Sequence, residues 1–337
     1  MVDRRDVPIS VAPLPSAARP PHAEEAAVPH RDPANPRWIG ESDALTRAVD
    51  TLRRFARSDA AVLVLGESGT GKELAAAELH ASSRRRGRFV ALNCGALSDS
   101  LAPSQLFGHA RGAFTGAVGQ HRGAFARAHR GTLFLDEVGE LPLSTQAMLL
   151  RALETRRICP VGAEVEVDVD ARVVCATHRD LAGMVEAGSF RADLYHRLSV
   201  LPVRMPALRT RPEDVDALLD HFAREHAADV GHPITFTADA RVAARQAEWP
   251  GNVRELRNAV HRAAFSSEGQ PITGLQLLPR PSRALGHSVR IRRGTFEQMR
   301  RALLHAVIEH EGSQRRAAEV LELPRSTLGN WLRDPTG

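Results

Sequence analysis

The stretch from residue 62 to residue 73, VLVLGESGTGKE, constrains the fold of this chain more than any other part. Its apolar run predicts a buried strand, and the residues after the lysine predict a helix. Between them, the spacing G-x-x-x-x-G-K is that of a P-loop, whose backbone N–H groups close around a β-phosphate at a helix N-terminus. The alternative, a chance glycine turn, does not explain the lysine. The candidate nucleotide-binding residues are Gly66, Glu67, Ser68, Gly69, Thr70, Gly71, Lys72 and Glu73.

Lys72 is the only lysine in the chain, although there are 45 basic residues. A bias of composition toward arginine accounts for the imbalance, but not for the one lysine that remains. A compact ammonium fits between the β- and γ-phosphate oxygens where a planar guanidinium does not. We therefore expect Lys72 to contact these phosphates. Glu73 stands where most P-loops carry Ser or Thr for magnesium, so we expect another residue to supply that ligand.

A pair of acids follows a second apolar run, in RGTLFLDEVGE. Residues 132–135 predict a buried parallel strand that ends at Asp136 and Glu137, and open α/β sheets bind ligands at the C-terminal ends of their strands. We expect Asp136 to hold Mg2+ and Glu137 to polarise the attacking water. Paired acids after a strand are common, but together with a P-loop they predict hydrolysis of ATP.

The segment FGHARGAFTGAVGQHRGAF, residues 107–125, carries the most specific motif, GAFTGA. With the P-loop and the acid pair, it makes the chain resemble the AAA+ ATPases that activate sigma-54 RNA polymerase, the bacterial enhancer-binding proteins related to NtrC. The resemblance runs from about residue 38 to about residue 333. It implies a surface loop that touches the sigma factor when ATP is bound. An ordinary glycine-rich loop is the alternative. The implied contact residues are Gly112, Ala113, Phe114, Thr115, Gly116 and Ala117.

The same resemblance assigns roles to further residues of the ATPase. Asn93 matches the asparagine that holds the catalytic glutamate until the γ-phosphate arrives, and a strand-end cap is the alternative. Arg191 and Arg197, in FRADLYHRLSV, match arginine fingers that reach a neighbouring subunit's nucleotide. In a chain rich in arginine, a solvated helix face is the rival explanation. Arg254, in WPGNVREL, matches the second sensor and would lie near the phosphates.

The first sensor departs from the expected pattern. In RVVCATHRDL, residues 172–176 predict a buried strand followed by Thr177, which we expect near the nucleotide. His178 stands where the resemblance leads us to expect asparagine, and its imidazole can donate one hydrogen bond. The preceding RRICPVGAEVEVDVD alternates as a β-hairpin does.

The C-terminal part, SQRRAAEVLELPRSTLGNWLR after the amphipathic FEQMRRALLHAVIEH, resembles the Fis-type helix-turn-helix of the same family. Residues 283–334 contain ten arginines against six acids, which suits contacts with DNA phosphates. A plain helical hairpin is the alternative. The expected core residues are Ala317, Ala318, Leu321, Leu328 and Leu332. The expected DNA-binding residues are Arg325, Ser326, Thr327 and Asn330.

These patterns together predict an α/β AAA+ P-loop ATPase domain at 37–205, a helical lid at 206–279, a linker at 280–294 and an all-α helix-turn-helix at 295–337. Residues 1–36, rich in proline and alanine, are expected to be disordered. Because no apolar run approaches the roughly 20 residues of a membrane span, we expect a cytoplasmic protein. Three widely spaced cysteines fit a reducing compartment.

The expected cofactors are ATP and Mg2+, and the expected partners are the sigma-54 RNA polymerase holoenzyme and enhancer DNA. The resemblance also implies a hexameric ring that rests as a dimer. Without a sensory domain, control is expected from a separate regulatory protein, from expression level or from the tail. One rival is a DNA-binding repressor with a vestigial ATPase fold, against which the intact Lys72, Asp136, Glu137 and GAFTGA argue. The other is an AAA+ helper of replication or transposition, which is not expected to carry GAFTGA. The net charge of +5 suits a polyanionic partner.

Overall fold

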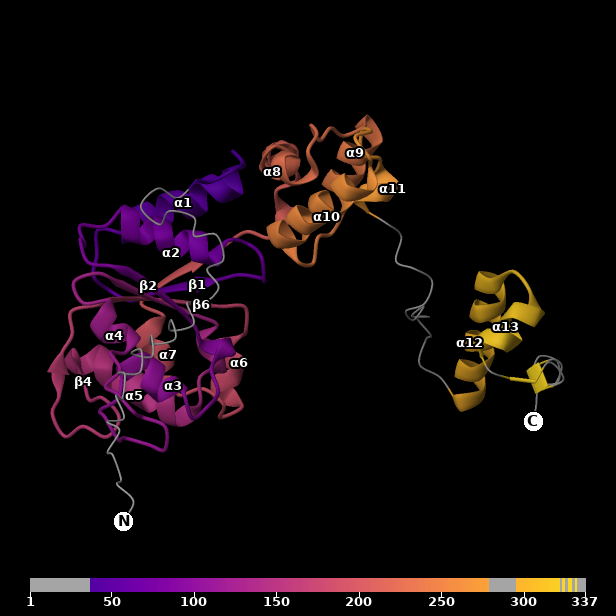
Figure 1. Ribbon diagram of the computed structural model, residues 1–337. Helices are drawn as coiled ribbons and strands as arrows, with labels where there is room; N and C mark the ends of the chain where they lie inside the picture. Colours follow the sequence, from indigo (N-terminus) through magenta and orange to yellow (C-terminus); the bar gives the residue numbers. More distant parts are fainter. Residues whose placement is uncertain (1–36, 279–294, 322, 325–326, 329–330, 332–337) are drawn as a thin grey trace, which may run out of the picture. The chain divides into compact units, whose positions relative to one another are not determined.

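The computed structural model describes residues 37–278, 295–321, 323–324, 327–328 and 331 (Figure 1). The predicted tail at 1–36 and the linker at 280–294 lie outside the described residues. The chain falls into two compact units, divided after residue 278. No helix among the described residues combines the length and the apolar character that crossing a membrane requires.

The first unit contains a five-stranded parallel sheet with the strand order β2-β3-β6-β1-β7. The three inner strands are almost fully buried, because helices cover both of their faces. The sequence predicted these three, and the structure confirms them. The strands are β1 (Val62–Leu65), β2 (Phe89–Asn93), β3 (Thr132–Asp136), β6 (Arg172–Thr177) and β7 (Leu201–Arg204).

Alternate residues of β3 belong to different hydrophobic clusters, one on each face of the sheet. Phe134 joins the cluster under α1 and α2, whereas Leu133 and Leu135 join the cluster with α3 to α7 (Figure 1). The sheet is thus the middle layer of three, as the predicted α/β class requires. The helices are α1 (Asp43–Phe55), α2 (Lys72–Ala81), α3 (Ala102–Phe107), α4 (Ala124–Arg127), α5 (Leu143–Thr155), α6 (Leu181–Glu186) and α7 (Ala192–Leu198).

Two short strands outside the sheet form the hairpin that the alternation predicted. β4 (Arg157–Ile158) pairs antiparallel with β5 (Val167–Asp168). Four 3-10 turns complete the loops of this unit. They are η1 (Cys94–Ala96), η2 (Val138–Glu140), η3 (Leu208–Thr210) and η4 (Pro212–Asp214).

A helical layer follows η4 and has its own core. Leu219, Phe222, Trp249 and Leu256 are almost completely buried in one cluster, which also contains Leu208 of η3. This layer is the helical lid that the sequence predicted. Its helices are α8 (Val215–Val230), α9 (Ala238–Gln246), α10 (Asn252–Ser266) and α11 (Gly274–Leu277).

The second unit contains α12 (Phe296–Glu311) and α13 (Gln314–Val320). Thr295 and Gln298 form a capping box at the start of α12, and Gly312, with φ of 68°, ends it. Among the described residues of this unit, the buried core is Leu304, Ala317, Ala318 and Leu328, with Leu321 and Trp331 packed against them. Leu332, Arg325, Ser326 and Asn330 lie outside the described residues, so the recognition helix remains a prediction.

Candidate nucleotide-binding site and surface loop

The P-loop connects β1 to α2 through three glycines with positive φ. Gly66, Gly69 and Gly71 have φ of 158°, 78° and 97°, a region that residues with a Cβ rarely adopt. At Gly69 a Cβ would also lie 2.2 Å from the carbonyl oxygen of Gly251 in the lid. The helix begins at Lys72, so its unpaired N–H groups face the loop and form a site for an anion.

Lys72 is turned into the site and almost buried, with 7% of its side chain exposed. Its Nζ donates to the carbonyl oxygens of Gly66 at 3.1 Å and Glu67 at 3.4 Å. It also forms an ion pair with Glu137 Oε1 at 3.4 Å. The ammonium is therefore held between the loop and the end of β3, where the phosphates of a nucleotide would enter.

The pKa values of Asp136 and Glu137 are shifted in opposite directions. Burial and the charge of Glu137 raise the pKa of Asp136 above its usual value, although Lys72 opposes this. Burial also disfavours ionised Glu137, but the hydrogen bond from His178 and the charge of Lys72 outweigh it and lower its pKa. Glu137 is therefore ionised at neutral pH, whereas the Asp136 carboxylate would be stabilised by a cation. The carboxylate oxygens of Asp136 are the kind of ligand that Mg2+ prefers.

Glu137 is held by the first-sensor segment, a contact that the sequence did not predict. Its Oε2 accepts from the backbone N–H of His178 at 3.3 Å and lies 2.7 Å from the ring Nδ1. Asn93, by contrast, accepts from the N–H of Gly95 at 2.9 Å and caps η1. The cap was the alternative role for Asn93. Its switching role remains a prediction, since β2 and β3 place Asn93 beside Asp136 at the same sheet edge.

His178→Ala is expected to lower kcat for ATP hydrolysis by about 10- to 100-fold while KM changes little, because Glu137 loses the 2.7 Å ring contact and keeps only the longer one from the backbone N–H. His178→Asn should restore part of the rate, since an amide can still donate to Glu137. Arg179→Ala is the matched control, because this exposed neighbour pairs with Glu140 instead. Steady-state phosphate release measures all three. Wild-type kcat in His178→Ala would contradict a positioning role.

The lid touches the P-loop through charged and polar side chains. Arg209 forms a two-pronged pair with Glu67, at 2.7 and 2.5 Å, and Asn252 Nδ2 donates to Glu67 Oε2 at 3.1 Å and to Ser68 O at 3.0 Å. The hydrogen bonds from Arg209 and Asn252 lower the pKa of Glu67 to about 2. Arg254 Nη1 donates to Ser68 Oγ at 3.0 Å. Of these lid residues, the sequence singled out only Arg254.

Three more predicted residues take no part in the lid contacts. Thr177, the last residue of β6, is buried beside the P-loop: its carbonyl oxygen accepts from the N–H of Gly66 at 3.3 Å, and its Oγ1 accepts from the N–H of Arg179 at 3.0 Å. Arg191 pairs with Asp193 at 2.7 Å, and Arg197 donates to the carbonyl of Leu153 at 3.1 Å. Among the described residues, no hydrogen bond or ion pair joins either arginine to the P-loop of its own chain.

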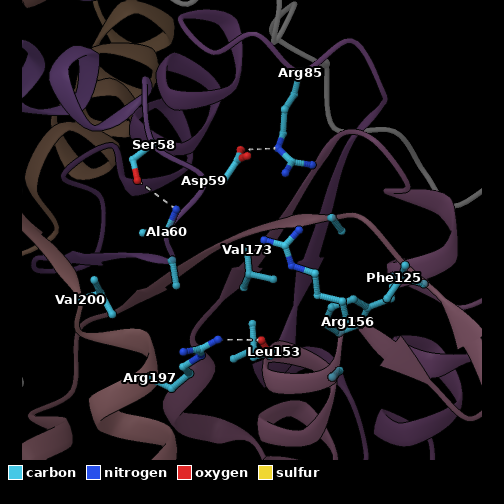
Figure 2. Close-up of a pocket in the computed structure, with 14 residues that line it drawn as sticks. Ser58, Asp59, Ala60, Arg85, Phe125, Leu153, Arg156, Val173, Arg197 and Val200 are labelled. Carbon is cyan, nitrogen blue, oxygen red and sulfur yellow. Dashed lines mark hydrogen bonds and ion pairs between the residues drawn. The ribbon is translucent and has the colours of Figure 1, made fainter.

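Arg197 lines a pocket together with Arg85 and Arg156, as Figure 2 shows. The volume of the pocket is about 410 Å³. Arg85 forms an ion pair with Asp59 there, with 2.9 Å between Arg85 Nε and Asp59 Oδ1. None of the residues lining this pocket belongs to the P-loop or to the acid pair, so it is not the nucleotide site.

The GAFTGA segment forms an exposed turn on the same domain. Gly112 and Gly116 have φ of 80° and 106°, and the N–H of Gly112 donates to the carbonyl of Ala117 at 2.9 Å. Phe114 is 41% exposed, with one edge against the His109 ring at 4.9 Å between centroids. Thr115 is exposed at the tip. The turn therefore presents an aromatic face and a hydroxyl outward.

Comparisons with known proteins decide the family. Residues 38–204 match the Sigma-54 interaction domain, and residues 209–288 match the AAA+ ATPase lid domain. The chain is 41% identical over 309 residues to the transcriptional regulatory protein ZraR of Salmonella typhi, an alignment that covers 90% of this chain and 70% of ZraR. The chain belongs to the family of sigma-54-dependent activators. The resemblance stated from the motifs is confirmed, and the core of the chain is an AAA+ ATPase domain with its lid.

Two further relatives are informative. The nitrogen fixation protein VnfA of Azotobacter vinelandii is 41% identical over 306 residues, which cover 88% of this chain and 58% of VnfA. The chain thus spans little more than half the length of that relative. The structure of NtrX from Brucella abortus in complex with ATP has a TM-score of 0.68 and 32% identity, covering 90% of this chain and 70% of NtrX.

Proposed function

We propose that this activator hydrolyses ATP and uses the cycle to remodel sigma-54 RNA polymerase, so that promoter complexes open. The observation that carries the proposal is the exposed GAFTGA turn on the domain that also holds the P-loop and the acid pair. The turn has no acid or base of its own, so it cannot hydrolyse ATP. It has an exposed aromatic ring and a hydroxyl, which are suited to contact a protein.

In the proposed reaction, the P-loop N–H groups and Lys72 bind the β- and γ-phosphates. Asp136 would hold Mg2+, which supplies positive charge to the phosphate oxygens. Lys72 would leave its ion pair with Glu137 to meet the phosphates, and the ionised Glu137 carboxylate would then orient a water molecule for attack. The ATP held by the related NtrX supports this assignment.

We further propose that the active form is a ring, a hexamer that rests as a dimer. Arg191 and Arg197 are partly exposed and contact no nucleotide-binding residue of their own chain in the described part. An arginine so placed can stabilise transition-state charge at a neighbouring subunit's site.

The second unit is the proposed enhancer-binding domain, a Fis-type helix-turn-helix. Its arginine surplus and the small helical core around Ala317, Ala318 and Leu328 support this assignment. Thr327, the one residue of the predicted DNA-facing set that the structure describes, is half-buried. Since the proposed partners are the polymerase and DNA, the proposed site of action is the cytoplasm.

Arg325→Ala is expected to weaken binding to the enhancer by about 1–3 kcal/mol without lowering basal ATPase activity, because it removes one contact from the proposed recognition helix. Arg301→Ala is the matched control, since this exposed residue lies on α12 of the same unit. A gel-shift titration compares the two variants. Equal affinity of Arg325→Ala and the wild type for the enhancer DNA would contradict the proposed contact between the recognition helix and DNA.

Mapping bound DNA across the genome tests the proposed function as a whole. We expect the sites to cluster upstream of sigma-54 promoters. Sites that overlap the start points of other promoters would support the repressor instead. Sites at replication origins or transposon ends would support the replication or transposition helper.

A further inference from the structure

Three side chains that ligate metals in proteins meet on the lid, outside the nucleotide site. His226 and Asp229 are three residues apart on α8, so they share one face of that helix. His261 lies on α10, which packs against α8 (Figure 1). One donor atom from each residue lies within 4.8 Å of the other two.

The separations fit a small coordination shell. Asp229 Oδ2 lies 3.2 Å from His226 Nδ1 and 3.8 Å from His261 Nε2. A tetrahedral zinc site with ligands about 2.0–2.1 Å from the metal places its ligand atoms roughly 3.3 Å apart. Modest rotation of the two partly exposed side chains would therefore close the shell.

Burial of His226 argues that this arrangement is more than a surface hydrogen bond. Only 5% of His226 is exposed, and Nδ1 is the ring nitrogen that faces Asp229, at 3.2 Å. The other ring nitrogen, Nε2, is buried without a partner among the described residues, so a histidine here costs free energy that an apolar side chain would avoid, and the metal would be held through Nδ1. The surrounding charges leave Asp229 available, because Arg257 of α10 pairs with Glu225 instead, at 2.7 Å.

We propose that His226, Asp229 and His261 bind one Zn2+ ion. Two imidazoles and one carboxylate suit zinc, whereas Mg2+ and Ca2+ prefer oxygen ligands alone. Asp229 and His261 are about half exposed, which leaves the fourth position open to water. The ion would link α8 to α10 and stiffen the lid, whose α10 carries the Asn252 and Arg254 contacts to the P-loop.

Titration calorimetry of the metal-stripped full chain with Zn2+ tests the site, in excess Mg2+ so that the Asp136 and Glu137 carboxylates are occupied. The variants are His261→Gln and Asp229→Asn, both at partly exposed positions that tolerate a polar substitute. His232→Gln is the matched control, a histidine of the lid outside the cluster. Melting curves without metal show whether each variant is folded. Absorption of bound Co2+ reports the coordination geometry.

The wild type and His232→Gln should bind one Zn2+ per chain and melt at a higher temperature with it. Both ligand variants should bind zinc at least about tenfold more weakly and lose the tetrahedral Co2+ spectrum. Unchanged zinc affinity and Co2+ absorption in folded His261→Gln and Asp229→Asn would overturn the proposal. The test uses neither ATPase nor DNA binding, so its failure would leave the proposed function intact.

Discussion

Lys72→Ala should abolish ATP binding, whereas Glu137→Gln should leave binding intact and stop turnover. Within the part of the chain that the structure describes, Lys72 is the cation held by the P-loop carbonyls, so its removal leaves the γ-phosphate charge without that partner. Glu137 forms an ion pair with the Lys72 ammonium at 3.4 Å. Its amide analogue cannot act as a base, and loss of a general base typically costs about 10²- to 10⁴-fold in rate.

Equilibrium binding of a fluorescent ATP analogue, followed by phosphate release, separates the two defects. Lys72→Arg should also fail to bind, because a planar guanidinium does not fit between the phosphate oxygens. Glu140→Gln is the control for the acid pair, since Glu140 follows three residues later and pairs with Arg179. Normal hydrolysis by Lys72→Ala or by Glu137→Gln would refute the assigned roles.

The inner strands were predictable because parallel strands covered on both faces need continuous apolar runs, and β1, β3 and β6 have them. The two edge strands were not predicted. In β7, Pro202 and Arg204 are exposed and only Val203 is buried, so the segment carries no distinctive pattern. Strand β2 is similar, with Val90 as its one buried residue.

The motifs predict which residues form the candidate site, but they do not predict how those residues contact one another. Glu67 and Arg209 are 142 positions apart, and only the folding of the lid onto the P-loop brings them together. His178 and Glu137 follow adjacent parallel strands, so the strand order would have placed them at one sheet edge. The sequence predicted both strands but not their order, and the partner of the glutamate was assigned to Asn93 from the family resemblance alone.

Thr115→Ala should keep ATPase activity and DNA binding but lose open-complex formation. Thr115 is exposed at the tip of the GAFTGA turn, and no described hydrogen bond ties its hydroxyl to the nucleotide site. The substitution therefore removes a group that faces outward and leaves Lys72, Asp136 and Glu137 unchanged. Thr115→Ser is the matched control, because it retains the hydroxyl and should retain most transcription.

The decisive measurement is transcription from a sigma-54 promoter alongside phosphate release by the same preparation. Binding of ATP would draw Lys72 away from Glu137. We expect the resulting movement at the end of β3 to be transmitted to the GAFTGA turn, which belongs to the same domain. If the turn only transmits that movement, its tip can be altered without changing hydrolysis. Full transcription by Thr115→Ala would exclude the hydroxyl as a contact. Loss of both activities together would show that the turn supports the ATPase fold instead of acting on the sigma factor.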